Sequence, residues 1–202
     1  MQFWNSLQTE KSWDILKDLT KKPFKFILIG GWAAYLWTNL HKSKDIDIII
    51  DYKALEYLKK NYELVKNDNL KKYEIKFGDI DLDIYLPYYS KLAIPVEDIK
   101  GYASKIENIE VVKPEVLLIL KQGAEIDRKN SIKGEKDRID IMTLLCFLDI
   151  NYTDYKLLLK KYNLDYFDRL KHIINSFKDI NYLNLNPREF KLQKKEIVNN
   201  LK

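Results

Sequence analysis

Cysteine and histidine are scarce in this chain of 202 residues, which contains one cysteine and two histidines. Cys146 has no second cysteine to pair with, so the chain can form neither an internal disulfide nor a cysteine-based zinc site. Because Cys146 lies within an apolar run, we interpret it as a small buried side chain and not as a reactive thiol. His41 and His172 are far apart in sequence and have no ligand-like neighbours, so they give no sign of a histidine metal centre.

Long apolar runs are also missing from the sequence. No stretch reaches the length of about 18 apolar residues that marks a membrane span. The first ten residues lack a basic region followed by an apolar stretch and a small-residue cleavage site, so we expect no signal peptide. These two absences predict a cytoplasmic protein without a membrane partner.

The residues that are abundant describe a folded, strongly solvated protein. Hydrophobic residues make up 46% of the chain and charged residues 32%, which is enough apolar content for a core without disulfides. Residues 1–113 carry 18 Lys/Arg against 17 Asp/Glu, whereas residues 114–202 carry 17 against 13. A mildly basic second half suits RNA or a polyphosphate, but on charge count alone we favour a solvated helix surface.

The apolar pattern changes its period near Pro114. Before it, short alternating or apolar runs predict strands, with a hairpin turn at Gly78-Asp79, and beyond it helical periods prevail. We expect strands at 24–29, 45–51, 73–77, 80–86 and 107–112, and helices at 3–19, 32–40, 52–61, 115–130, 135–148, 153–162 and 166–177, with a loop and one short helix from 181 onward. The pattern predicts an α+β fold, in which a mixed twisted sheet with helices on one side forms residues 1–113, and a helical region, residues 114–202, packs on this core.

Glycines and aspartates occur in an order that suits metal and phosphate chemistry. Gly30-Gly31 comes first, then Asp45-Ile46-Asp47, and then Asp81-Leu82-Asp83. Residues i and i+2 of a strand point to the same face, roughly 6.5–7 Å apart along the chain. Two such carboxylates and a third from a neighbouring strand can hold Mg²⁺, which prefers oxygen ligands, water and substrate phosphates. A bound cation also neutralises acidic groups that are costly on otherwise apolar strands.

The segment around the first aspartate pair also offers groups that suit a triphosphate. Gly30 and Gly31 join a strand to a helix, where backbone N–H groups can approach phosphate oxygens without a Cβ in the way. Ser43 and Lys44 directly precede Asp45 and add a hydroxyl and a positive charge. We therefore predict Gly30, Gly31, Ser43 and Lys44 as nucleotide-binding residues.

These motifs together resemble the polymerase-β-like nucleotidyltransferase superfamily, and within it the AbiEii-type toxin and small-nucleotidyltransferase branches. The first part of the resemblance is carried by the glycine segment 29–36 and by Ser43-Lys44-Asp45-Ile46-Asp47-Ile48. The second part is carried by the helix 112–121, which ends on a lysine, by Arg128, and by Lys136-Asp137-Arg138-Ile139-Asp140. It covers about residues 24–148 and leaves the helices from Tyr152 unassigned.

The resemblance implies an enzyme that binds a nucleoside triphosphate such as ATP. Asp45 and Asp47 would ligate Mg²⁺ or Mn²⁺, and a third carboxylate would complete the catalytic and metal set. Asp79, Asp81 and Asp83 share strand parity; we favour Asp83, whose Asp-Ile-Tyr-Leu-Pro context is most similar to the family's strand end, and take Asp81 second.

Three further site residues come from the second part of the resemblance. Lys121 and Lys136 would contact the triphosphate or the acceptor, and Asp137 would orient one of these lysines. The competing interpretation is structural: Lys121 extends from an apolar helix to solvent. Asp137 and Asp140 are then either charges that answer the dipole at a helix N-terminus or partners of Arg128 and Arg138.

Two functions follow from these patterns, and they belong to different classes. The first is an enzyme that transfers a nucleoside monophosphate to a hydroxyl group. The acceptor is an RNA end such as that of tRNA, a protein or a small molecule. A toxin-like role with an antitoxin partner is one setting for this activity. The second is a nucleotide- or RNA-binding module of toxin–antitoxin type with little catalytic activity. A Rossmann-type dinucleotide site is set aside, because it requires G-x-G-x-x-G and a parallel βαβ unit, whereas we expect the acidic strands to be antiparallel.

Overall fold

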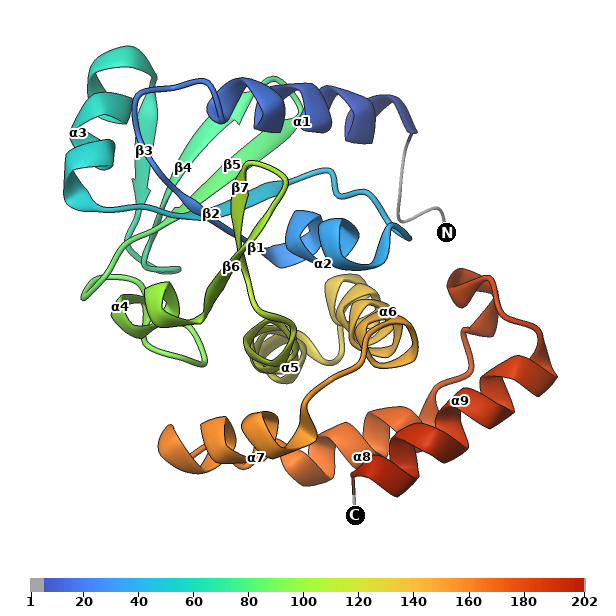
Figure 1. The fold of residues 1–202 in the computed structure, drawn as a ribbon. Helices are drawn as coiled ribbons and strands as arrows, with labels where there is room; N and C mark the ends of the chain where they lie inside the picture. The colour runs from blue at the N-terminus through green and yellow to red at the C-terminus, as the bar shows by residue number, and fades with distance from the viewer. Residues whose placement is uncertain (1–5, 202) are drawn as a thin grey trace. The chain divides into compact units, whose positions relative to one another are not determined.

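Contacts along the chain define two compact units, residues 1–113 and residues 114–202. The computed structural model describes residues 6–201 (Figure 1). The helix expected from Phe3 is observed from Ser6 to Leu19, and residues 3–5 lie outside the described residues. Within residues 6–201, none of the helices has both the length and the apolar character needed to cross a membrane.

The first unit is a seven-stranded mixed sheet with helices. Its elements are α1 (Ser6–Leu19), β1 (Ile27–Ile29), α2 (Gly30–Thr38), β2 (Ile46–Ile49), α3 (Tyr52–Asn61), β3 (Leu64–Asn67), β4 (Lys72–Phe77), β5 (Ile80–Tyr85), α4 (Val96–Ile99), η1 (Lys100–Tyr102), β6 (Ala103–Ile106) and β7 (Ile109–Val112). The strands lie in the order β3-β4-β5-β2-β1-β7-β6. This sheet confirms the predicted α+β class.

Strand pairing corrects one expectation about the acidic strands. β2 and β5 are parallel, with Asp47 opposite Asp83, and not antiparallel as predicted. β1 and β2, which flank α2, are antiparallel, so these three elements do not form the parallel βαβ unit of a dinucleotide-binding fold. The expectation was wrong because the hairpin of β4 and β5 fixes only the pairing between those two strands, and the next neighbour of β5 comes from much earlier in the chain.

Buried and half-buried residues alternate along β5, so its apolar side chains face the core and its acidic side chains lie on the other face. In β5, Ile80, Leu82 and Ile84 are at most 2% exposed, whereas the residues between them are half-buried. Helix α2 lies against β1 and β2 and carries Trp32, whose ring stacks on Trp13 of α1 with centroids 5.0 Å apart. The Trp32 indole N–H donates to the Ser12 hydroxyl at 2.8 Å, so the bulky residue after the glycine pair belongs to the core.

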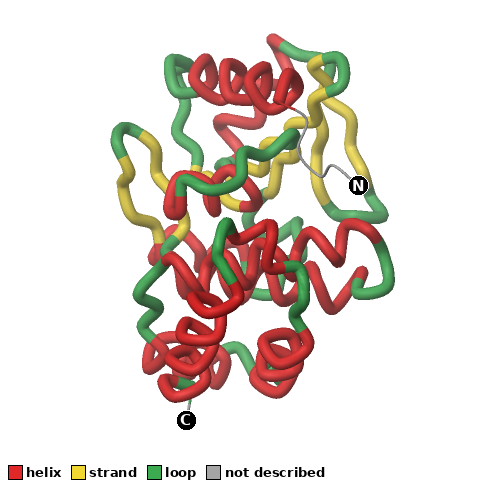
Figure 2. Tube along the Cα trace, turned by 90° about the vertical axis from the view of Figure 1, so that its right-hand side faces the viewer, coloured by secondary structure: helices red, strands yellow, loops and turns green. Residues whose placement is uncertain are grey.

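The second unit consists of helices in its described part. Its elements are α5 (Pro114–Arg128), α6 (Ile132–Phe147), α7 (Tyr152–Lys161), α8 (Phe167–Ser176), η2 (Ile180–Leu183) and α9 (Pro187–Asn200). All strands of the described residues lie within residues 1–113, and Figure 2 shows strands and helices in separate colours.

Local sequence signals account for where these helices begin. Pro114 occupies the first turn of α5, as predicted, and the Ser131 hydroxyl accepts from the Gly134 N–H at 3.1 Å to start α6 three residues before the predicted position. Asn186 and Glu189 form a capping box that starts α9, which is longer than the short helix expected. Cys146 of α6 is buried, as interpreted, and burial raises the pKa of its thiol to about 12.

Candidate active site

Gly30 makes room for the side chain of Asp47. Ile29, which precedes the glycine pair, lies opposite Asp47 in the antiparallel pairing of β1 and β2. Gly30 has a φ of +68°, and a Cβ at this position would come within 2.1 Å of Asp47 Oδ2 and 2.9 Å of Asp47 Cβ. No residue with a side chain fits there unless Asp47 moves as a whole. The predicted phosphate-binding glycine is therefore also the residue that sets the position of a predicted metal ligand.

Strand register brings two of the predicted carboxylates side by side. Asp47 of β2 and Asp83 of β5 are register partners on neighbouring parallel strands, and Asp45 lies just before the first residue of β2. Of the alternatives for the third carboxylate, Asp81 is the register partner of Lys76, and Asp79 is exposed in the hairpin turn. The geometry thus favours Asp83 as the partner of Asp47.

Burial and a neighbouring charge alter the protonation of Asp83. Burial first, and the charge of Asp47 second, raise the pKa of Asp83 to about 7, although Lys72 acts in the opposite direction. Lys72 Nζ lies 2.6 Å from Asp83 Oδ2 and 3.1 Å from Glu74 Oε1, and the Asn67 amide donates to Glu74 at 2.9 Å. Lys72 thus supplies Asp83 with a counter-charge from within the protein.

Sequence reasoning missed Lys72 and Glu74, although a signal for them was present. The two-residue turn Gly78-Asp79 fixes the register of the hairpin, which places Glu74 directly opposite Asp83. Lys72 lies two residues before Glu74, on the same face of β4. Reading the predicted hairpin pair by pair would have identified both residues.

Two carboxylate oxygens at this site suit a divalent cation. Asp45 Oδ1 and Asp83 Oδ1 are buried and have no hydrogen-bond partner. Buried acceptors are ordinarily satisfied, so an unpartnered oxygen on each of two predicted metal ligands fits a hard cation. Within the described part of the chain, no three His, Cys, Asp or Glu side chains form a ready metal cage.

The other residues predicted near the triphosphate lie in the loop that leads into β2. Ser43 is 4% exposed, and Lys44 is partly exposed beside it. Gly31 is buried at the start of α2. Their contact with phosphate stays a prediction.

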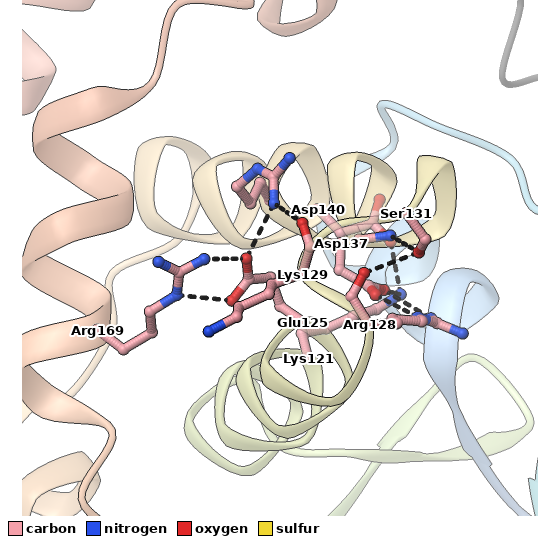
Figure 3. A network of polar contacts seen from close by, with 10 residues as sticks. Lys121, Glu125, Arg128, Lys129, Ser131, Asp137, Asp140 and Arg169 are labelled. Atoms are coloured by element: carbon pink, nitrogen blue, oxygen red, sulfur yellow. Dashed lines mark hydrogen bonds and ion pairs between the residues drawn. The ribbon is translucent and has the colours of Figure 1, made fainter.

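In the second unit, Lys121 and Asp137 belong to a buried ionic network that joins α5 and α6 (Figure 3). Lys121 is 7% exposed, and its Nζ lies 2.5 Å from Asp140 and 3.9 Å from Asp137. Arg128 donates to both carboxylate oxygens of Asp137, at 2.6 and 2.9 Å. Lys136 is half-exposed on α6.

A second cluster in the same unit surrounds Glu125, which is 0% exposed. Arg138 donates a hydrogen bond to Glu125 at 3.0 Å, and Arg169 of α8 donates to both carboxylate oxygens of Glu125. Although burial raises the pKa of Glu125, the hydrogen bonds from Arg169 and Arg138 lower it below its ordinary value. The sequence offered no way to pair residues this far apart, so Glu125 and Arg169 were missed.

The structure shows which basic residues pair with the acidic residues of α6. Asp137 pairs with Arg128, as the structural interpretation had it, whereas Asp140 pairs with Lys121, and Arg138 turns to Glu125. Lys121 does not reach solvent from its apolar helix. A nucleotide contact by Lys121, Lys136 or Asp137 remains a prediction from the family resemblance.

Several solved structures share this fold, and nucleotidyltransferases are among them. ANT(2″)-Ia in complex with adenylyl-2″-tobramycin matches 80% of this chain and 99% of its own, with 13% identity and a TM-score of 0.53. A Helicobacter pylori protein assigned as a nucleotidyltransferase matches 97% of this chain and 94% of its own, with 20% identity and a TM-score of 0.51. JHP933 from Helicobacter pylori matches 98% and 94%, with 19% identity and a TM-score of 0.51.

No protein-family model and no curated protein sequence matches the chain. Identities of 20% or less establish the fold and leave the chemistry to the residues of this chain. The class defined by the fold is therefore that of a nucleotidyltransferase-like α+β protein with a helical C-terminal part.

Proposed function

We propose that the protein is a metal-dependent nucleotidyltransferase that moves a nucleoside monophosphate from a nucleoside triphosphate to an acceptor hydroxyl. The observation that carries this proposal is the register pairing of Asp47 with Asp83 beside Gly30 in a nucleotidyltransferase fold, together with one buried, unpartnered oxygen on each of Asp45 and Asp83. Asp45, Asp47 and Asp83 would hold Mg²⁺ or Mn²⁺, which would neutralise phosphate charge and polarise the α-phosphate.

The chain's own residues suit the remaining steps of the transfer. The acceptor oxygen attacks the α-phosphorus, the bond from that phosphorus to the α,β-bridging oxygen breaks, and pyrophosphate leaves. Asp83 would help to take the proton of the attacking hydroxyl, as the family resemblance implies for the third carboxylate. Backbone N–H groups after Gly30 and the side chains of Ser43 and Lys44 would bind the triphosphate.

The proposed acceptor is a molecule with a free hydroxyl group. ANT(2″)-Ia was solved with an adenylylated antibiotic, which makes a small-molecule hydroxyl one candidate acceptor for this chain. An RNA end or a protein hydroxyl is the other class, in line with the AbiEii-like motifs, and a toxin-like role with an antitoxin partner belongs to that class.

A test of this proposal uses the purified protein with each of the four labelled nucleoside triphosphates, Mg²⁺ and cell extract. Labelled nucleoside monophosphate should become attached to an acceptor, and Asp47→Asn should abolish the attachment. Mg²⁺ plus the preferred triphosphate should also raise the melting temperature, because the ligand binds the folded state only. A double variant, Asp45→Asn with Asp47→Asn, that kept the full increase would place the metal site elsewhere.

The binding-module alternative is favoured by one observation, the pairing of Asp83 with Lys72, which satisfies one oxygen of this carboxylate without a metal. Such a module would bind the nucleotide but form no covalent product with any acceptor. Equal nucleotide binding by wild type and Asp83→Asn, with no labelled product from either, would establish this alternative.

A further inference from the structure

Lys72 links the carboxylate of Asp83 to that of a second acidic residue. Asp47, Asp83 and Glu74 are register neighbours on β2, β5 and β4, so three acidic side chains lie in a row across the sheet. The Lys72 ammonium lies between the second and the third of them, at 2.6 Å from Asp83 and 3.1 Å from Glu74. The side chains of Lys72, Asp83 and Glu74 are 12, 16 and 20% exposed, which keeps water from weakening these contacts.

The two partners of Lys72 differ in their surroundings. Asp83 adjoins Asp47 and has one oxygen without any hydrogen-bond partner, whereas Glu74 receives a hydrogen bond from Asn67. A divalent cation bound between Asp47 and Asp83 would repel the ammonium, which lies against the same carboxylate. Glu74 offers the ammonium a second acceptor at hydrogen-bond distance, so Lys72 can leave Asp83 without becoming a buried unpaired charge.

We propose that Lys72 is a positioning residue that occupies Asp83 in the metal-free protein and shifts to Glu74 when a divalent cation takes Asp83 as a ligand. The inference rests on the proposed function, because it assumes that Asp83 is a metal ligand. Lys72 in this role stabilises the empty carboxylate pair and at the same time weakens the binding of the cation in the absence of nucleotide. Removing Lys72 should therefore strengthen cation binding. If Lys72 had a purely structural role, its removal would loosen the site and weaken cation binding.

The experiment is a titration of the full-length protein with Mn²⁺ alone, followed by the paramagnetic resonance signal of free Mn²⁺. Lys72→Met should bind Mn²⁺ about tenfold more tightly than wild type, as expected for loss of a competing charge-assisted contact. Lys76→Met is the matched control, because Lys76 lies on the same face of β4 and its loss removes the same charge. Lys72→Arg keeps the competing cation and should bind Mn²⁺ close to the wild-type level.

Thermal melting of the same proteins gives a second measurement that does not depend on activity. Without metal, Lys72→Met should melt below wild type, because no ammonium then offsets the repulsion of Asp83 by its acidic neighbours Asp47 and Glu74. Saturating Mn²⁺ should remove most of that difference. Glu74→Gln, which removes the second acceptor, should weaken Mn²⁺ binding in the wild-type background and change it less in the Lys72→Met background.

The outcomes separate this inference from the proposed function. If wild type binds Mn²⁺ and Lys72→Met binds it no more tightly than Lys76→Met does, the positioning role of Lys72 is wrong and the metal site stands. If wild type binds no Mn²⁺ but Lys72→Met does, the positioning role is supported. If none of the proteins binds Mn²⁺, either alone or with a nucleoside triphosphate, both the inference and the metal-dependent function are wrong.

Discussion

At the scale of single residues, Gly30 combines two requirements that no other residue type meets. Its φ of +68° is unfavourable for side chains with a Cβ, and the space that a Cβ would fill is taken by Asp47. Gly78 of the β4–β5 turn shares the first requirement, with a φ of +63°, but has open space around it. A substitution at Gly78 introduces backbone strain alone, whereas a substitution at Gly30 also displaces the carboxylate of Asp47. Comparing the two therefore separates these effects.

We expect Gly78→Ala to lower the free energy of unfolding by about 1–2 kcal/mol and to leave nucleotide binding unchanged. Gly30→Ala should cost more than Gly78→Ala, because Asp47 must also move. It should also lose the increase in melting temperature produced by Mg²⁺ and nucleotide. Denaturant unfolding and thermal melting of both variants measure these effects, and equal behaviour of the two would mean that Asp47 is not positioned by Gly30.

Asp83 leads to a prediction about pH. Its pKa is about 7 in the folded protein, against an ordinary value of 3.8 for aspartate, so the folded state binds a proton that the unfolded state releases. The resulting stabilisation is complete below about pH 4 and is lost as the pH rises through 7. Asp83→Asn, which imitates the neutral acid, should therefore gain stability relative to wild type between pH 5 and pH 8.

Urea unfolding in a chelating buffer measures this difference across the pH range. The ion pairs of Glu125 contribute little slope in this window, because its lowered pKa keeps it ionised above pH 5. A difference between Asp83→Asn and wild type that stays constant from pH 5 to pH 8 would contradict the raised pKa of Asp83.

At the scale of elements, the sequence predicted the helices and strands that a local residue pattern determines. It did not predict the strand pairings that depend on residues far apart in the chain. The hairpin of β4 and β5, the helices α2 and α3, and α5 beginning at Pro114 follow from alternation, glycine and proline. β3 and β6 were missed because each is four residues long and has no buried face to produce an apolar pattern. The parallel pairing of β2 with β5 was missed because hydrophobic pattern does not encode strand direction.

The candidate site divides in the same way. The choice of Asp45, Asp47 and Asp83 came from motif order, strand parity and, for Asp83, the resemblance to the family's strand end. The structure adds that Asp47 lies opposite Asp83 beside Gly30. The contact of Lys72 with Asp83 depends on register, which the sequence encodes in the length of a turn and not in any motif.

The helix pair α5 and α6 gives a prediction that separates structure from nucleotide binding. Lys121→Met leaves Asp140 buried at 3% exposure without its ammonium partner, which should cost about 3–5 kcal/mol of stability. Adding Asp140→Leu should recover most of that loss, because an apolar pair of similar volume replaces the ion pair. Urea unfolding measures both effects.

The same variants test the predicted nucleotide contact of Lys121. If the double variant regains stability and also binds nucleotide like wild type, Lys121 is structural only. If it regains stability but binds nucleotide about tenfold or more weakly, Lys121 contacts the nucleotide as the family resemblance implies.

At the scale of the whole molecule, the predicted metal ligands all lie in one of the two units. The glycine turn, Asp45, Asp47, Asp83 and Lys72 all lie within residues 1–113, whereas the buried ionic networks of Lys121 and Glu125 lie within residues 114–202. Hydrogen exchange measured by mass spectrometry resolves the two units separately.

We expect Mg²⁺ with a non-hydrolysable triphosphate to slow amide exchange mainly in the segment from β1 to the start of α2 and in the loop leading into β2. Phosphate bound at backbone N–H groups blocks their exchange directly, and ordering of nearby loops raises the free energy of local opening. Asp47→Asn is the control and should show no such protection. Protection found mainly in residues 114–201 would place the nucleotide on the helical unit.

The single cysteine has a practical consequence for measuring the distance between the two units. Cys146 is buried, and its pKa of about 12 keeps it a thiol at neutral pH, so maleimide reagents, which attack through the thiolate, should react with it slowly. A pair of cysteines introduced at exposed positions, one in each unit, can then be labelled with dyes or spin probes while the native residue stays in place. Energy transfer between such labels would report the distance between the units as metal, nucleotide and acceptor are added in turn.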